Sequence, residues 1–397
     1  MRTRFARAPA AVGVVLAAGA AVIVLVGCGG ASSSASQSDI RRSVQRLVSG
    51  HIPGALLFVR QGDRSYTVAA GYADETRKVP MRAGDTYPIG STTKTFTGVL
   101  VMRLVAQRKI ALDAPVSRYL PGLLPAGNEI TIRELLAHTS GLANYETDPL
   151  VLVPYVSGNL RFQTAPLDIV HAEARRPLLF APGTQFNYTS TESIVLALLA
   201  ESVAGGTYGS QLRDYIFRPL ALRHTILPTD KDGLPDVHGS VAWSKYVPEA
   251  NPVPVDSAEL SPSIAWSAGG IRSTVQDVAD FFRGLFTGKL LPPAQVEAME
   301  DTTATGGRYG LDLMPTGGNA YDWGSDTQAI NTTCGRAWGH GGNFPGYLNL
   351  PISSPDGSRQ AVLLVNTDPT LMTAAQLKQV FGVLDTAYCR GVPLSRS

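Results

Sequence analysis

The sequence predicts an α+β fold in which one antiparallel sheet is built from both chain ends and a mostly helical lobe, at about 116–264, is inserted between them. Two observations support this architecture. Segments 54–60 and 65–72 flank a short polar turn, and segments 346–352 and 359–367 do the same near the C-terminus, which is the pattern of two hairpins. Each hairpin is accompanied by a helical pattern, whereas the middle of the chain alternates helical stretches with Pro- and Gly-rich loops. One sheet shared by both ends is the most economical way to bury these elements.

The composition is that of a globular protein. Of 397 residues, 44% are hydrophobic and 17% are charged, a balance that can bury a core. The formal net charge of +2 includes Arg2, Arg4 and Arg7, which lie in a segment that we expect to be removed, leaving 2 − 3 = −1. A near-neutral body without basic runs argues against a nucleic-acid partner.

Residues 1–27 have the layout of an export signal, in which basic residues precede an apolar run. The run ends in Leu25-Val26-Gly27-Cys28, which resembles a bacterial lipobox, so we expect a lipoprotein signal peptide and lipidation of Cys28. A retained membrane anchor is the alternative, although about 17 apolar residues is the short limit for spanning a bilayer. Either reading places the body outside the cytoplasmic membrane, lipid-anchored or secreted, behind a Gly/Ser-rich tether at 28–38.

Two cysteines, Cys334 and Cys389, remain once Cys28 is lipidated. In an oxidising compartment we expect them to form a disulfide. Neither has a histidine or carboxylate at ligand spacing, and the six histidines are scattered, so the sequence predicts no metal site.

The N-terminal elements follow from local patterns. Ser38-Asp39 is expected to cap a helix whose apolar positions Ile40, Val44 and Leu47 fall on one face. The polar stretch at 61–64 contains Gly and Asp and forms the turn of the first hairpin.

The later elements are predicted in the same way. Helical stretches of the inserted lobe are expected at 132–137, 166–175, 193–203 and 210–217. The turn of the second hairpin lies at 354–357, and 371–388 is predicted as a helix with Leu377, Phe381 and Leu384 on its apolar face.

The sharpest chemical feature is Gly90-Ser91-Thr92-Thr93-Lys94, followed by an apolar run to Val105. Ser91 can begin a helix, and Lys94, one turn later, lies on the same face. Because the run is apolar nearly all round, this helix is expected to be central and buried. A poorly solvated lysine favours its neutral amine, which can accept a proton from the neighbouring hydroxyl and so activate Ser91 as a nucleophile. An ordinary serine cap followed by an ordinary lysine is the alternative.

Two further segments add polar groups downstream. Residues 181–190 end in Tyr188-Thr189-Ser190 before an apolar helix, and residues 338–347 carry His340-Gly341-Gly342-Asn343 into a strand. In this order the three elements resemble those of the serine penicillin-recognising enzymes: class C β-lactamases, low-molecular-mass D-alanyl-D-alanine carboxypeptidases and esterases of the same fold. The likeness extends over about 40–395 and includes the stretches 134–142 and 267–274.

The sequence is most similar to the secreted D-alanyl-D-alanine carboxypeptidases with a His-x-Gly third motif. These proteins also carry a cysteine just before that motif and another near the C-terminus, which Cys334 and Cys389 match. The resemblance implies a β-lactamase/transpeptidase-like fold and a serine hydrolase domain over about 39–395.

The resemblance also implies a role for each matched residue. Ser91 would be the nucleophile, Lys94 its proton acceptor and Tyr188 a general base and acid; which of the last two takes the serine proton stays open. His340-Gly341-Gly342 would form the strand edge along which the substrate lies. The backbone N–H groups of Ser91 and Asn343 would form the oxyanion hole, each worth roughly 100- to 1000-fold in rate.

The sequence departs from the family pattern at two positions. Ser190 stands where the second motif normally ends in Asn, so recognition of a substrate amide group should be weaker or different. Gly341 stands where the carboxypeptidases have Thr, which removes a hydroxyl that helps to bind a terminal carboxylate. Arg336 is a nearby cation that could replace it.

Four other polar positions are expected to be structural. Ser267 lies in a stretch that approximates the nucleophile elbow of α/β-hydrolases, but no parallel βαβ pattern surrounds it. Thr274 and Asp277 are expected to cap a helix, and His138 is expected to be a hydrogen-bonded structural residue.

Together these features predict an exported serine hydrolase that acts through a Ser91 acyl-enzyme, without metal or organic cofactor. The leading activity is that of a D-alanyl-D-alanine carboxypeptidase on peptidoglycan peptides. The alternatives are an esterase or D-amino-acid amidase acting on a small ester or amide, and a non-catalytic penicillin- or cell-wall-binding module. We expect a monomer that is attached to the membrane through its lipid.

Overall fold

The computed structural model of the chain describes residues 36–50, 52–229, 231–247, 250, 253–316 and 332–391. The chain divides into two compact units, Met1–Ser33 and Ser34–Ser397, and only the second contains described residues. The predicted signal peptide, Cys28 and most of the tether therefore lie outside the described residues. Within the described ranges, no helix combines the length and the hydrophobicity needed to cross a membrane.

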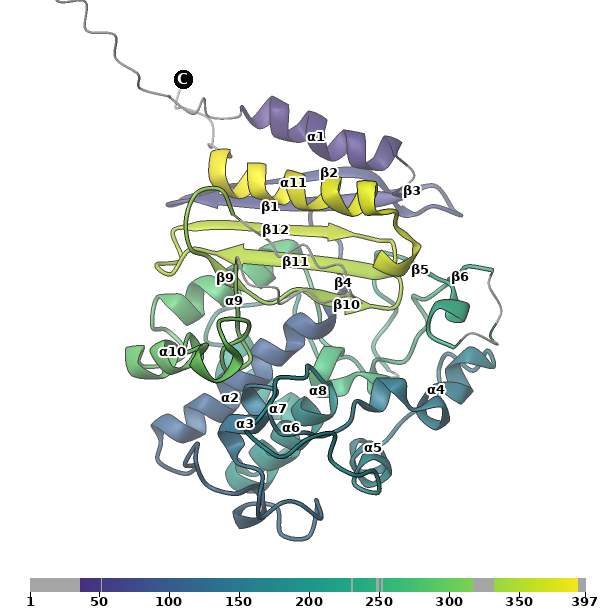
Figure 1. Cartoon of the computed structure of the whole chain (residues 1–397). Coiled ribbons are helices and arrows are strands. Elements are labelled where there is room, and N and C mark those ends of the chain that lie inside the picture. The colour runs from purple at the N-terminus through teal and green to yellow at the C-terminus, as the bar shows by residue number, and fades with distance from the viewer. Residues whose placement is uncertain are drawn as a thin grey trace, which may run out of the picture. The chain divides into compact units, whose positions relative to one another are not determined.

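The second unit is built around one antiparallel sheet to which both chain ends contribute, as predicted (Figure 1). Its strand order is β3-β2-β1-β12-β11-β9-β8, and β10 also pairs with β11. The central pairing joins the first strand to the last, with Leu57 opposite Leu363. The strands are β1 (Gly54–Gln61), β2 (Arg64–Asp74), β3 (Val79–Pro80), β8 (Met314–Pro315), β9 (Trp338–Gly339), β10 (Gly342–Phe344), β11 (Tyr347–Ser353) and β12 (Arg359–Val365).

Both faces of this sheet are covered by helices. Strand β1 is buried from Gly54 to Arg60, and its side chains alternate between two cores: Leu57 packs with α1 (Gln37–Ser49) and α11 (Ala374–Arg390), and Phe58 packs on the opposite side. That opposite side contacts α9 (Val275–Phe286). Figure 1 shows α1 and α11 together at one side of the sheet and the remaining helices beyond its other side.

The first helix begins earlier than the sequence predicted. The cap is Ser36 rather than Ser38: its hydroxyl accepts the Asp39 N–H at 3.1 Å, and the Asp39 carboxylate accepts the Ser36 N–H at 3.0 Å. This reciprocal capping box satisfies two N–H groups that would otherwise lack partners, so it prevails over a cap at Ser38. Gln37 and Ser38, assigned to the tether, therefore belong to the helix. Ile40, Val44 and Leu47 form its buried face, as predicted.

The last helix buries the predicted side, with the most buried positions displaced slightly from the predicted ones. Leu384 is buried, but Leu377 and Phe381 are only half-buried. Val380 and Ala387, each one turn from Leu384, are fully buried instead. Leu377 and Phe381 lie at the margin of this buried side and pack against the same core.

The part of the chain between the two hairpins contains the other helices, which are joined by long loops. Every residue from Thr93 to Met102 in α2 (Thr93–Ala106) is buried, as expected for a central helix, and α2 packs against α6 (Thr191–Ala204). The other helices are α3 (Ile132–Leu136), α4 (Pro149–Val156), α5 (Pro166–Glu173), α7 (Tyr208–Leu212), α8 (Trp266–Gly269) and α10 (Pro293–Met299). Two short antiparallel pairs complete this part: β4 (Tyr87–Pro88) with β7 (Arg272–Ser273), and β5 (Ser240–Val241) with β6 (Val255–Asp256).

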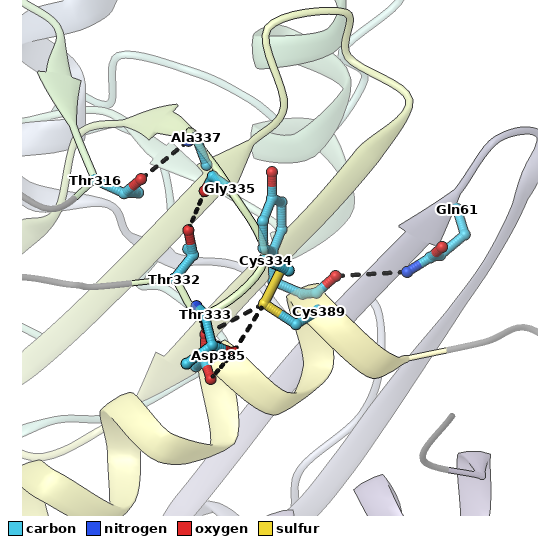
Figure 2. The surroundings of a disulfide bond; sticks show 10 residues. Gln61, Thr316, Thr332, Thr333, Cys334, Gly335, Ala337, Asp385 and Cys389 are labelled. Atoms are coloured by element: carbon cyan, nitrogen blue, oxygen red, sulfur yellow. Dashed lines mark hydrogen bonds between the residues drawn. A yellow bond between two sulfur atoms is a disulfide. The ribbon is translucent and has the colours of Figure 1, made fainter. Parts of the chain in front are cut away.

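A disulfide joins Cys334 to Cys389, the pairing that the sequence predicted (Figure 2). Cys334 lies just before β9, and Cys389 lies in the last turn of α11. A second link beside the disulfide holds the same two segments, because the Thr333 hydroxyl donates to an oxygen of Asp385 at 3.0 Å. The segment that leads into β9 is therefore fixed to the last helix.

Loss of this disulfide is expected to destabilise the fold substantially. The bond spans 55 residues of sequence, and closing a loop of that length stabilises the native state by about 4 kcal/mol in the chain-entropy model. The double variant Cys334→Ser/Cys389→Ser should therefore unfold at a lower denaturant concentration than the wild type, with an equal or steeper slope because its unfolded chain is less compact. Identical midpoints, or immediate alkylation of both wild-type cysteines without reductant, would contradict the prediction.

Candidate active site

Ser91 lies in the short turn Gly90–Thr92 that leads directly into α2. It is half-buried, whereas Lys94, one turn into the helix, is completely buried. The Lys94 Nζ atom lies 3.1 Å from the Ser91 Oγ atom. The sequence spacing therefore produces the expected contact between hydroxyl and amine.

Lys94 has three hydrogen-bond partners in its buried position. Besides Ser91, its Nζ atom lies 3.0 Å from Ser190 Oγ and 3.1 Å from the carbonyl oxygen of Ala268. An ammonium group would donate to all three, whereas a neutral amine would donate to two and accept the Ser91 proton. Burial lowers the pKa of Lys94 to about 8, against the opposing effect of nearby carboxylates, of which Glu146 is the strongest. A substantial neutral fraction is therefore available near neutral pH.

Tyr188 brings the second predicted segment to the same point. It precedes α6, and its ring centroid lies 4.9 Å from Lys94 Nζ. The same ring lies 4.5 Å from the His138 ring and 6.1 Å from the His340 ring, measured between centroids. The Ser91–Lys94 turn, the Tyr188 segment and the His340 segment, far apart in sequence, therefore meet around one amine.

Two glycines allow the nucleophile turn to approach strand β10. Gly90 has a φ of +56°, and a Cβ atom at this position would lie 2.5 Å from the carbonyl oxygen of Asn343. Opposite it, a Cβ atom at Gly342 would lie 1.9 Å from the carbonyl oxygen of Ile89. This approach holds the backbone of Ser91 beside that of Asn343, the two residues whose N–H groups were expected to form an oxyanion hole.

A side chain at position 90 should disturb this approach. Alanine is disfavoured at a positive φ wherever it occurs, so Gly62→Ala provides a matched control: Gly62 has a φ of +60° and no atom within 4 Å of a Cβ atom there. We expect Gly90→Ala to be less stable than Gly62→Ala by about 1–3 kcal/mol, the usual range for overpacking. Equal denaturation midpoints for the two variants would show that the close approach to Asn343 is absent.

His340 is completely buried at the start of the strand edge. Its Nδ1 atom lies 2.8 Å from the Gly341 carbonyl oxygen, and its Nε2 atom lies 2.7 Å from the Tyr309 hydroxyl. Burial first, and the charge of Lys94 second, lower the pKa of His340 well below its ordinary value. The Thr92 hydroxyl donates to the His340 carbonyl oxygen at 2.7 Å, which ties the strand directly to the nucleophile turn.

The residues that depart from the family pattern are placed as follows. Ser190 is buried, with its hydroxyl bound to Lys94, and its N–H donates to the Asn144 side chain at 3.1 Å. Gly341 is buried beside His340. Arg336 is exposed, and its guanidinium lies 5.3 Å from the Trp338 ring centroid.

Sequence reasoning missed three buried polar residues around this site, Glu192, Tyr309 and Asp312. Glu192 offered a signal, because it is a carboxylate at the start of an otherwise apolar helical run. A charge in such a run must be neutralised or paired when the helix is buried. Nothing in the local pattern distinguishes Tyr309 or Asp312 from ordinary loop residues.

The structure also places an acceptor on strand β10 and a cavity beyond it. The Oδ1 atom of Asn343 is buried and has no hydrogen-bond partner among the residues that the structure describes. A cavity of about 380 Å³ is lined by Phe344, the residue after Asn343, and by Gly270. Its charged lining residues are Arg161, Lys231, Asp232, Glu259 and Arg272.

Comparison with known proteins identifies the family to which the chain belongs. The family model described as Beta-lactamase matches residues 40–380. Protein flp of Staphylococcus aureus (strain MW2) is 31% identical over 196 residues, which is 48% of this chain but only 38% of that protein. The putative penicillin-binding protein PbpX of Bacillus subtilis (strain 168) is 26% identical over 268 residues, 67% of this chain and 63% of that protein. The chain thus spans less than two thirds of the length of either relative.

Solved structures match over most of the chain. The D-stereospecific amidohydrolase from Streptomyces sp. is 27% identical, with a TM-score of 0.72 over 87% of this chain and 97% of that one. The D-amino acid amidase from Ochrobactrum anthropi SV3, complexed with L-phenylalanine, gives a TM-score of 0.74 over 87% and 96%, respectively. At 24% identity, this second likeness shows the fold alone.

Proposed function

This chain belongs to the beta-lactamase family of serine hydrolases, and from that premise we propose that it cleaves amide bonds of D-amino-acid compounds through an acyl-enzyme on Ser91. The observation that carries the proposal is the buried Lys94 amine at 3.1 Å from the Ser91 hydroxyl. A hydroxyl becomes a useful nucleophile only when a base of suitable pKa lies within hydrogen-bond reach, and this pair meets both conditions.

The geometry supports the following sequence of steps. Lys94 accepts the Ser91 proton as Oγ attacks the carbonyl carbon, and the N–H groups of Ser91 and Asn343 bind the developing oxyanion. The proton passes to the leaving nitrogen, directly from Lys94 or through Tyr188, and the C–N bond breaks. Water then attacks the Ser91 ester with Lys94 again accepting a proton, which releases the acid and restores the hydroxyl.

The leading substrate is the D-alanyl-D-alanine end of a peptidoglycan peptide. The family, the export pattern of the sequence and the cysteine pair support it. The unpartnered Oδ1 atom of Asn343 suits the N–H of a peptide-like substrate, which a simple ester lacks.

A D-amino-acid amidase is the second candidate, and Gly341 favours it. Without a hydroxyl at this position the strand edge has one group fewer for a terminal carboxylate, which an amide substrate does not have. The D-stereospecific amidohydrolase at 27% identity is consistent with the same reaction class.

A panel of substrates tests the proposal and separates the candidates. We would compare kcat/KM on a D-Ala-D-Ala peptide, a D-amino-acid amide, its L-enantiomer and a short p-nitrophenyl ester. Hydrolysis of the D-amide faster than its L-enantiomer is expected, and the faster of the peptide and the D-amide identifies the activity. Equal rates for both enantiomers, or turnover of the ester alone, would overturn the proposal in favour of an esterase. Absence of turnover and of labelling by a fluorescent penicillin would leave the non-catalytic binding module.

We also propose that the protein is an extracytoplasmic lipoprotein anchored through Cys28. The lipobox-like tetrad supports this, and a disulfide suits an oxidising compartment. In a bacterial host, the wild type should incorporate a labelled fatty acid and fractionate with membranes. A Cys28→Ser variant should do neither, and equal fatty-acid incorporation by both proteins would contradict the assignment.

A further inference from the structure

A continuous row of buried polar groups lies behind the candidate site. It runs from Glu192 at the start of α6, through His138 and Tyr309, to His340 at the strand edge, and all four side chains are buried. Burying such groups is costly unless each finds a hydrogen-bond partner. The row therefore connects the helix that follows Ser190 with the strand that carries the proposed oxyanion donor.

The contacts along this row are short and consecutive. Glu192 Oε2 contacts His138 Nδ1. His138 Nε2 lies 3.2 Å from the Tyr309 hydroxyl, and the same hydroxyl lies 2.7 Å from His340 Nε2. His340 Nδ1 lies 2.8 Å from the Gly341 carbonyl oxygen, where the row ends.

The end of the row fixes the direction of its hydrogen bonds. A carbonyl oxygen can only accept, so His340 Nδ1 must carry a proton. Burial lowers the pKa of His340 well below its ordinary value, so the ring is neutral and its Nε2 atom must accept. Tyr309 therefore donates its single proton to His340, and its oxygen must accept from His138 Nε2.

The other end of the row is consistent with the same direction. With its proton on Nε2, a neutral His138 accepts at Nδ1, towards which the Thr189 N–H points at 3.4 Å. Glu192 must then donate to this nitrogen as a neutral carboxylic acid. Burial raises the pKa of Glu192 well above its ordinary value and lowers that of His138, which supports a neutral pair.

The other titratable groups that face the row do not change this assignment. Asp312 Oδ1 is a second acceptor for the Tyr309 hydroxyl, but at 3.4 Å it lies further away than His340 Nε2 at 2.7 Å, so the shorter bond to His340 takes the proton. Asp312 Oδ1 also lies 3.8 Å from His138 Nε2, and burial raises the pKa of Asp312 well above its ordinary value. The Tyr188 ring lies between the row and Lys94, whose positive charge disfavours protonation of both histidines.

We propose that Glu192, His138 and Tyr309 are positioning residues, a one-directional hydrogen-bond chain that fixes His340 in its Nδ1–H tautomer and so fixes the strand edge at Gly341. This inference rests on the proposed function, because it assigns the chain to the strand that would bind the oxyanion. The hydrogen bonds of such a chain reinforce one another, since each donor is polarised by the bond it accepts. Removing one hydroxyl in the middle should therefore loosen both ends.

Tyr309→Phe is the first test. We expect kcat to fall about 10- to 100-fold with KM changed less than about threefold, because a displaced oxyanion donor weakens transition-state binding without removing substrate contacts. Tyr155→Phe is the matched control: Tyr155 is also completely buried, and its hydroxyl donates to the Phe162 carbonyl oxygen at 3.0 Å. A kcat for Tyr309→Phe equal to that of Tyr155→Phe would overturn the proposal.

Glu192 provides a test by conservative replacement. The carboxamide of Glu192→Gln can still donate to His138 Nδ1, as the neutral acid does, whereas Glu192→Leu cannot. We expect Glu192→Gln to retain a kcat within about threefold of the wild type and Glu192→Leu to lose about 10-fold or more. Equal losses in both variants would show that Glu192 is an ionised acceptor, which contradicts the assigned direction.

A spectroscopic readout separates this inference from the proposed function. In protein labelled with ¹⁵N at histidine, His340 is expected in the neutral Nδ1–H form and His138 in the neutral Nε2–H form at pH 7, assigned with His340→Asn and His138→Asn variants. A protonated His138, or a proton on Nε2 of His340, would overturn the chain even in an active enzyme. If the tautomers are as expected but no substrate acylates Ser91, the proposed function fails and the arrangement of the chain stands.

Discussion

Replacing Ser91 with alanine is expected to abolish hydrolysis of every substrate that the wild type turns over. Lys94 binds the hydroxyls of both Ser91 and Ser190, but only Ser91 lies in the turn before α2 whose backbone packs against β10. Loss of a nucleophile lowers kcat by about 10⁴-fold or more in enzymes of this kind. The variant should fold normally, because the hydroxyl is half-buried and its removal leaves Lys94 with two partners.

Ser267→Ala is the matched control for this experiment. Ser267 belongs to a stretch that approximates a different nucleophile motif, but its hydroxyl is buried and donates to the Ser193 carbonyl oxygen at 2.9 Å. We expect Ser267→Ala to keep its turnover. Loss of activity in Ser267→Ala with retention in Ser91→Ala would reverse the assignment of the nucleophile.

The second large effect is expected when Lys94 changes its protonation state with pH or is replaced by methionine. Only its neutral form accepts a proton, and its pKa is about 8, so the reactive fraction rises as pH increases through that value. The neutral fraction is about one tenth at pH 7 and about nine tenths at pH 9, so kcat/KM should rise about tenfold over this range. Lys94→Met should lose about 10²- to 10⁴-fold in kcat and the pH dependence with it. A wild-type kcat/KM that falls between pH 7 and 9 would contradict the role of Lys94 as base.

Stability measurements show whether Lys94→Met loses activity because the base is missing or because the protein does not fold. The pKa of Lys94 is lower in the folded than in the unfolded chain, where it is near 10.5. Between about pH 8 and 10.5 the unfolded state therefore binds more protons, and the wild-type free energy of unfolding should rise with pH in this window. Below pH 8 the buried ammonium costs free energy that methionine does not incur. We expect Lys94→Met to be no less stable than the wild type at pH 7, with a flatter dependence above pH 8.

Local patterns were sufficient to predict the sheet. In both hairpins the turn residues and the apolar strands lie within about 20 residues of each other, so no distant contact is needed to recognise them. The sequence placed both hairpins in one sheet without showing which strands join them, and the structure pairs β1 with β12.

The faces and ends of helices were predicted less well, because their partners lie far away in sequence. In α11, contact with β12 and α1 buries Val380 and Ala387 more deeply than Leu377 and Phe381, which lie at the margin of the same core. At α1, either Ser36 or Ser38 could cap the helix, and the match between Ser36 and Asp39 selects the earlier one.

The residues of the candidate site also divide into those that a local pattern predicts and those that depend on distant contacts. Ser91 and Lys94 were found from their spacing within one helix turn, and Tyr188 and His340 required the family resemblance. Glu192 and Tyr309 were missed because their role depends on a row of tertiary contacts that no local pattern contains. The role of a buried polar residue can be assigned only when its hydrogen-bond partners are known.

The most direct test of an acyl-enzyme on Ser91 is the mass of the intact protein during turnover. After rapid acid quenching of a reaction with a slowly hydrolysed β-lactam or activated D-alanyl ester, we expect one added acyl group per chain, on the peptide that contains Ser91. Deacylation should restore the original mass, and Ser91→Ala should show no adduct. No adduct on the wild type with either reagent, or an equal adduct on both proteins, would contradict the account.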